Sequence, residues 1–112
     1  MLICLAASVL LTSSSLNARL AGSTRSEKAG WIYVRLEGSP QRVGFQHGYW
    51  LANEIDDVIK VQTVLVGHYK KGDPEKVYRT QRDDAMRVLW PRIPAEYQRE
   101  LKGITEGIRA RG

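Results

Sequence analysis

The stretch Gly38-Ser-Pro-Gln-Arg-Val-Gly-Phe-Gln-His-Gly48 decides how this 112-residue chain folds. Ser39 before Pro40 is typical of a helix start, because a serine hydroxyl can accept a hydrogen bond from the first turn and proline fits the first helical position. In the helix that follows, Gly44 and Gly48 are four residues apart and lie on one face. Each interior glycine costs a helix about 1 kcal/mol relative to alanine. We therefore expect a closely packed partner on that face, rather than a ligand.

A second glycine pair occurs near the end of the chain, where Gly103 and Gly107 are again four residues apart. The apolar residues of this stretch repeat with a helical period: Tyr97, Leu101, Ile104 and Ile108. Two helices that each present a glycine face can pack closely against one another or lie on a sheet. The sequence leaves both arrangements open.

Residues 31–36, Trp-Ile-Tyr-Val-Arg-Leu, lie upstream of the first glycine pair. They alternate between two faces and are rich in β-branched and aromatic types, which predicts a strand. No other segment shows a convincing strand pattern. A lone strand leaves backbone donors and acceptors unpaired along both edges, so partner strands are expected in another chain or beyond Gly112.

Three helices are predicted after the strand. The first runs from about Gln41 to about His68. Asp73-Pro74 repeats the cap-and-proline pattern and starts the second, which Trp90-Pro91 ends, because a residue before proline is disfavoured in the α region. Pro94 begins the third. The predicted fold class is α+β and mostly α-helical.

The N-terminal residues Leu2–Leu11 form an apolar run that is shorter than the roughly 20 residues of a membrane-spanning helix. The run predicts a signal peptide over residues 1–22, cleaved after Ala18 or within Ala21-Gly22-Ser23, and hence an exported protein without a stable membrane span. No Lys or Arg precedes the run, so a buried N-terminal helix and a misassigned start codon remain alternatives. Residues 23–29 are predicted to be a polar linker.

Few side chains in the chain can carry chemistry. Cys4 is the only cysteine and lies inside the apolar run, so a processed chain has no thiol for disulfides, zinc or catalysis. His47 and His68 are not at a helical i, i+4 spacing, and no metal or cofactor is predicted. His47 has no nucleophile to activate, which favours a structural hydrogen-bonding role; a place at the edge of an active site is the alternative.

The charged residues are interleaved in sign, although the formal net charge is +5. Mixed charges of this kind are typical of solvated helix faces, and no nucleic-acid partner is predicted. The adjacent acids Asp56-Asp57 and Asp83-Asp84 point in different directions on a helix and are poor candidates for a catalytic pair. Trp90 is interpreted as a packing anchor.

Two motifs, in this order, resemble a known family. The first is Gly38-x-Pro40-x-x-x-Gly44-x-Gln46-His47-Gly48 after a strand, and the second is Trp90-Pro91 followed by Tyr97, Glu100, Gly103-Ile104 and Gly107. Together they resemble the penicillin-biosynthetic acyltransferase family, autoproteolytic cysteine acyltransferases and hydrolases of the Ntn superfamily. The phrase from Gly44 to Ile55 is most similar to its bacterial, exported phospholipase-B-like relatives. The resemblance covers about residues 30–112.

The resemblance implies an αββα sandwich, to which residues 30–112 would contribute the first strand and a helical layer. It also implies a precursor that cuts itself before a cysteine, whose thiol then attacks an acyl amide or ester through a thioester intermediate. The implied partners are the remainder of the precursor and a small acyl substrate.

The sequence departs from the family pattern because no cysteine follows Gly30. The nucleophile is expected after Gly112, no catalytic residue is assigned within the chain, and the chain alone is expected to be inactive. The alternative is a stand-alone exported helical module that binds a partner through its glycine-lined faces.

Overall fold

The computed structural model describes residues 15–112, so the apolar run 2–11 and Cys4 lie outside the described residues. The described chain is mostly helical with one two-stranded antiparallel sheet, which confirms the mostly helical α+β class. None of its helices is long and apolar enough to cross a bilayer.

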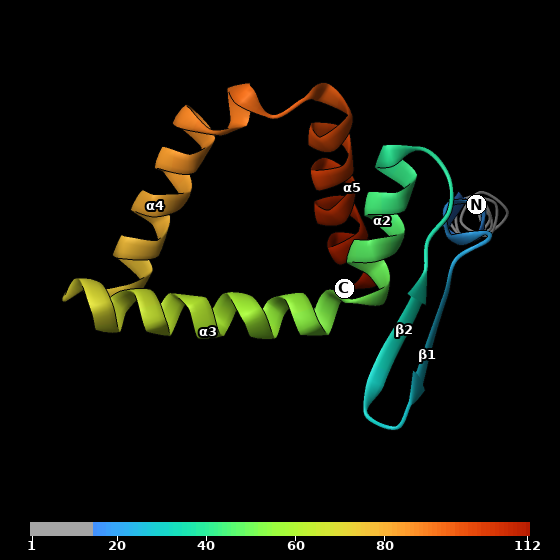
Figure 1. The fold of residues 1–112 in the computed structure, drawn as a ribbon, viewed down its shortest axis with the longest axis horizontal. Coiled ribbons are helices and arrows are strands. Elements are labelled where there is room, and N and C mark those ends of the chain that lie inside the picture. Colours follow the sequence, from blue (N-terminus) through green and yellow to red (C-terminus); the bar gives the residue numbers. More distant parts are fainter. Residues whose placement is uncertain (1–14) are drawn as a thin grey trace, which may run out of the picture.

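The elements follow one another along the chain after helical residues 15–20: β1 (Thr24–Lys28), β2 (Trp31–Arg35), α2 (Pro40–Trp50), α3 (Ala52–Lys70), α4 (Pro74–Val88), the short 3₁₀ helix η1 (Trp90–Arg92) and α5 (Ala95–Arg111). Figure 1 shows α3, α4 and α5 as three sides of an open frame, with α2 against α5 and the hairpin of β1 and β2 outside it.

The contact between α2 and α5 is built from the two glycine pairs. A Cβ atom placed on Gly44 or Gly48 would lie closer than 3.0 Å to the carbonyl oxygen of Glu100 or Ile104. On the α5 side of the contact, a Cβ atom placed on Gly103 or Gly107 would likewise lie closer than 3.0 Å to a backbone carbonyl oxygen of α2. The helices therefore touch backbone to backbone, as small residues allow. Of the two arrangements that the sequence leaves open, the structure has the helices packed on each other. We call this contact the glycine seam.

The two helices of the glycine seam run in the same direction. Gly44 faces Glu100 and Gly48 faces Ile104, so the facing position advances along both helices together. Figure 1 shows both descending side by side toward the C-terminus. Neighbouring parallel helices cannot be joined by a short turn, and here α3 and α4 carry the chain back to the start of α5.

The single helix expected from about Gln41 to about His68 is wrong: the chain forms two helices separated at Leu51. This residue has φ −114° and ψ 22°, far from helical values near −63° and −42°. No glycine or proline marks the break, so sequence reasoning had no signal for it. The break directs α3 away from the glycine seam (Figure 1).

The linker expected at residues 23–29 is also wrong, because it contains β1. Its partner is β2, with Thr24 opposite Arg35 and Lys28 opposite Trp31. Ala29 and Gly30 form the two-residue turn, both with positive φ (52° and 79°), as a type I′ hairpin turn requires. The strand was missed because β1 is polar on both faces and Ala-Gly is a weak turn signal beside Asn-Gly.

The helix caps agree with the sequence. The Ser39 hydroxyl accepts a hydrogen bond from the Arg42 amide, and the Asp73 carboxylate accepts one from the Glu75 amide at 3.0 Å. Trp90 and Pro91 lie in η1, which follows the end of α4. The ring of Pro74 packs against Gly67 near the end of α3, so that glycine closes the corner between α3 and α4.

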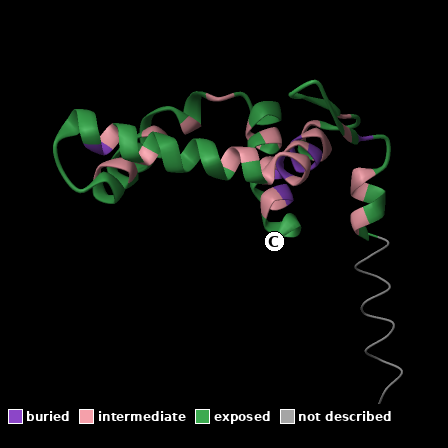
Figure 2. Ribbon diagram, turned by 90° about the horizontal axis from the view of Figure 1, so that it is seen from below, coloured by how far each residue is buried: buried purple, intermediate pink, exposed green. Residues whose placement is uncertain are grey.

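The interior of the described chain is small. Phe45 is its one fully buried hydrophobic residue, and Figure 2 shows burial concentrated where α2 meets α5. The apolar stripe of α5 is only partly covered: Tyr97 and Leu101 are 54% and 42% exposed, Ile104 and Ile108 are half-buried, and the neighbouring Gly103 and Gly107 are buried. The radius of gyration is 17.6 Å, against about 13 Å for a compact domain of 100 residues.

Adding a methyl group to the glycine seam tests its role. We expect Gly48→Ala to lower the free energy of unfolding by about 1–3 kcal/mol or more, because the backbone of α5 must shift to admit the methyl group. Urea unfolding followed by circular dichroism measures the change. Gly72→Ala is the matched control, since its Cβ would meet only Val77 at 3.5 Å. Equal midpoints for the two variants would contradict the seam.

In the hairpin turn, a substitution is expected to stabilise the structure rather than destabilise it. Ala29→Asn should raise the free energy of unfolding of the hairpin by several tenths of a kcal/mol, because asparagine tolerates the left-handed conformation that Ala29 adopts. Gly30→Ala should lower it, for the same reason. Hydrogen exchange of the β1 and β2 amides reports both changes. Slower exchange in Gly30→Ala than in Ala29→Asn would refute the turn assignment.

Candidate functional site

The residues singled out from the sequence fall into three places. The glycine seam brings together Gly44, Gly48, Gly103 and Gly107. Two more precede or begin α2: Gly38, with φ 126°, and Pro40, its first residue. The remaining pair, Trp90 and Pro91, lies in η1.

His47 is half-buried on α2, between the two glycines of the seam in sequence. Its backbone carbonyl accepts the Leu51 amide at 3.0 Å, at the point where α2 ends. Residues 15–112 contain no cysteine, so this part of the chain offers the imidazole no thiol to activate. Neither role predicted for the His47 side chain is tested by this geometry, and both remain predictions.

The acidic pairs lie on exposed helix surfaces. Asp56 forms an i, i+4 ion pair with Lys60, and its hydrogen bond raises the pKa of that lysine above the usual value. Asp83 pairs with Arg82, and Asp84 pairs with Arg87. These are ordinary solvated pairs. Within residues 15–112, no three His, Cys, Asp or Glu side chains gather as a metal site would require.

Gln46 is the most fully buried polar residue, with 0% of its surface exposed. Its Oε1 accepts the Glu37 amide at 2.8 Å, while its Nε2 donates to the carbonyl of Glu37 at 3.1 Å and to that of Arg19 at 3.0 Å. A third carbonyl, of Ala21, lies 3.5 Å from the same nitrogen. One side chain thus joins α2, the end of the hairpin and the segment before β1.

Two arginines support the same junction. The Arg42 guanidinium donates to the carbonyls of Ala21 at 2.6 Å and Arg19 at 3.3 Å. The Arg19 guanidinium lies 3.5 Å from the centre of the Phe45 ring and pairs with Glu106 of α5. A cation over an aromatic face is attracted by the ring, so the Arg19 side chain covers the small core from outside.

The hairpin is fastened to α2 and α3 by a second group of contacts. The Trp50 indole nitrogen donates to the Ser23 hydroxyl at 2.9 Å. The Arg25 guanidinium donates to the Trp50 carbonyl at 3.0 Å and pairs with Glu54 at 2.8 Å. These bonds fix β1 beside the break between α2 and α3.

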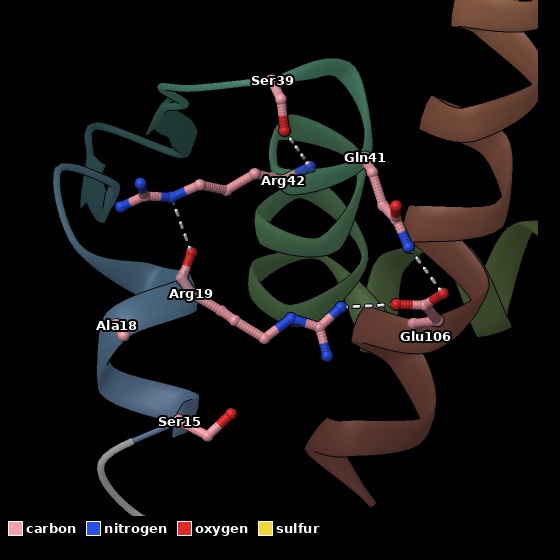
Figure 3. A pocket seen from close by; sticks show the side chains of 7 residues that line it. All are labelled: Ser15, Ala18, Arg19, Ser39, Gln41, Arg42 and Glu106. Atoms are coloured by element: carbon pink, nitrogen blue, oxygen red, sulfur yellow. Dashed lines mark hydrogen bonds and ion pairs between the residues drawn. The ribbon is translucent and has the colours of Figure 1, made fainter.

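A hollow of about 530 Å³ opens beside the N-terminus of α2. Figure 3 shows its lining side chains: Ser15, Ala18, Arg19, Ser39, Gln41, Arg42 and Glu106. Glu106 pairs with Arg19 and accepts a hydrogen bond from Gln41, and the Arg42 guanidinium donates to backbone carbonyls. Both guanidinium groups of the lining therefore have hydrogen-bond partners among the described residues.

Sequence reasoning assigned Gln46 no site role and named it only within the family pattern. A buried glutamine cannot be told from an exposed one by hydropathy, and its backbone partners carry no sequence signal. The geometry of the described residues is that of a polar junction, and it contains no arrangement of nucleophile and base.

Comparison with known proteins gives one distant relative. No protein-family profile and no solved structure match the sequence. An uncharacterized protein of Archaeoglobus fulgidus is 29% identical to this chain over 85 residues, which is 74% of the chain and 14% of that protein. The chain is therefore similar to a small part of a much longer protein.

Substitution of Gln46 tests the junction. We expect Gln46→Leu to lower the free energy of unfolding by several kcal/mol, because a buried amide and two carbonyls lose their partner at about 1–3 kcal/mol each. Gln46→Glu should also destabilise, since the carboxylate would face the two carbonyls. Thermal unfolding checks both, with the exposed Gln62→Glu as the charge-matched control. Two glutamate variants of equal stability would show that the junction contributes little.

Proposed function

We propose that the parent protein is an exported, self-processing Ntn-type cysteine acyltransferase or amide or ester hydrolase, related to phospholipase-B-like enzymes. In this proposal residues 30–112 supply the first strand and a helical layer of an αββα sandwich. The nucleophilic cysteine lies beyond Gly112, and the described residues position other parts of the enzyme.

The observation that carries the proposal is the uncovered apolar surface of the long helices. On α3, Val61 and Val64 are 56% and 66% exposed, and Leu89, the C-cap of α4, is 56% exposed. Soluble monomers rarely expose contiguous apolar patches of more than a few hundred Å². Helices with such surfaces are expected to pack against further structure, as the helical layer of a sandwich does against its sheets.

The two-stranded sheet supports the same conclusion. Within the described residues, β1 and β2 pair only with each other, so each keeps one open edge. An isolated hairpin is marginally stable, and further strands are needed to complete a sheet. The long relative from Archaeoglobus fulgidus is consistent with a domain of which this chain is a part.

Enzymatic assay of the chain with and without its downstream sequence tests the proposal. Purified residues 1–112 should hydrolyse neither acyl amides nor acyl esters, because they hold no thiol nucleophile after Cys4. Extension of the gene should reveal a cysteine at the start of a strand, and the extended protein should cleave itself before that cysteine. Its Cys→Ser variant, the matched control, should lose acyl-transfer and hydrolytic activity.

A stop codon directly after Gly112, together with monomeric and cooperative unfolding of the chain, would contradict the proposal. That outcome would favour the stand-alone binding module. Hydrolytic activity of the 112-residue chain would contradict both readings.

A further inference from the structure

One edge of β1 has no partner strand within the described part of the chain. Figure 1 shows β2 between β1 and the frame of helices, so the open edge of β1 faces away from that frame. The family resemblance begins at about residue 30 and therefore includes β2 but not β1. Strands of the parent protein that extend the sheet from β2 would leave the edge of β1 free.

The backbone groups on this open edge belong to Arg25 and Glu27. The two-residue turn brings the Lys28 carbonyl to the Trp31 amide, and hydrogen-bonded pairs then alternate along an antiparallel ladder. Lys28 and Ser26 therefore bond to β2, whereas the N–H and C=O groups of Arg25 and Glu27 point away from it. Among the described residues, no backbone group outside the hairpin bonds to them.

We propose that two copies of this chain pair along β1, antiparallel and centred on Ser26, and so join their hairpins into one continuous sheet. A two-fold axis makes an edge strand antiparallel to its own copy and places the same residues on both sides of the contact. In this register the backbone groups of Arg25 meet those of Glu27 in the second copy, and the reverse. Backbone hydrogen bonds then close the interface, as in other additions of a strand to a sheet edge.

The charges of β1 select this register. An antiparallel self-pairing that brings the outward backbone groups together places Arg25 against itself, Glu27 against itself, or Arg25 against Glu27. The first two put like charges directly opposite each other, which is destabilising, and the third forms an oppositely charged pair on each side of the axis. Charged residues on an edge strand usually prevent association with other chains. In β1 they oppose the two other registers and favour this one.

The side chains of these two residues are available for the pairing. Arg25 donates to the Trp50 carbonyl and pairs with Glu54, so its position is fixed before a second copy binds and less side-chain freedom is lost on association. Its guanidinium has more N–H donors than these contacts use. Glu27 pairs with Arg25 of its own strand at 2.6 Å, and its side chain is 67% exposed, so a second copy can reach it.

Cysteine cross-linking of the full chain tests the register, in a Cys4→Ser background that removes the native thiol. In the proposed sheet Ser26 faces its own copy as a non-hydrogen-bonded pair, whose Cα atoms lie about 4.5 Å apart, within the range of a disulfide. Ser26→Cys should therefore give a disulfide-linked dimer on mild oxidation, read by intact mass. Thr24→Cys is the matched control, because Thr24 is also exposed. Its copy would lie about 13 Å away along the strand, so it should give about tenfold less linked dimer.

Reversal of one charge tests the pairing itself. Glu27→Arg places arginine opposite arginine on both sides of the axis and should weaken self-association, measured by sedimentation velocity, by about tenfold or more. Glu96→Arg makes the same change at an exposed position of α5 and should leave association unchanged. Circular dichroism verifies that each variant keeps the helical content of the unaltered chain.

A chain that sediments as a monomer at every concentration would overturn the proposal, as would equal cross-linking of Ser26→Cys and Thr24→Cys. Association that persists in Glu27→Arg would also overturn it and would instead place the contact on another surface, such as the exposed apolar side chains of α3 and α4. These outcomes leave the proposed enzymatic function untouched, because they concern an edge outside the resemblance.

Discussion

The backbone-to-backbone contact of α2 with α5 is the constraint on which the rest of the described structure depends. Four glycines remove the side chains that would hold the helices apart, so each helix contacts the carbonyls of the other. Such contact brings Cα hydrogens toward carbonyl oxygens, which adds weak attraction to dense packing. Because the two helices are parallel, the chain must return to the same end between them. The break at Leu51 and the corner at Gly67 shape that return.

A different face of α2 holds the polar junction. Gln46 and Arg42 bind backbone carbonyls of the segment before β1, and Gln46 also binds Glu37 after β2. Helix α2 therefore makes two contacts that organise the described structure. In the glycine seam it lacks side chains, and in the polar junction it buries the side-chain amide of Gln46. Outside these contacts few apolar residues of the described chain are buried, and α3 and α4 keep exposed apolar side chains.

Sequence reasoning succeeded where the cause is local. The caps at Ser39 and Asp73, the end of the second helix near Trp90 and the glycine pairs were all predictable, because each depends on residues a few positions apart. The polar strand β1 was missed because it is defined by pairing with β2. The break at Leu51 was missed because neither proline nor glycine stands at that position. The hydrogen bonds of Gln46 to backbone atoms could not be predicted, because hydropathy does not distinguish a buried glutamine from an exposed one.

The parallel arrangement of α2 and α5 has a consequence for the order of folding. Ribosomes add roughly 5–20 residues per second, so α2 leaves the ribosome several seconds before its partner exists. A helix with two interior glycines has little stability alone, and one of eleven residues is short even for a good helix former. The hairpin and the helix caps can form early, but α2 is stabilised only after α5 has been synthesised and has packed against it.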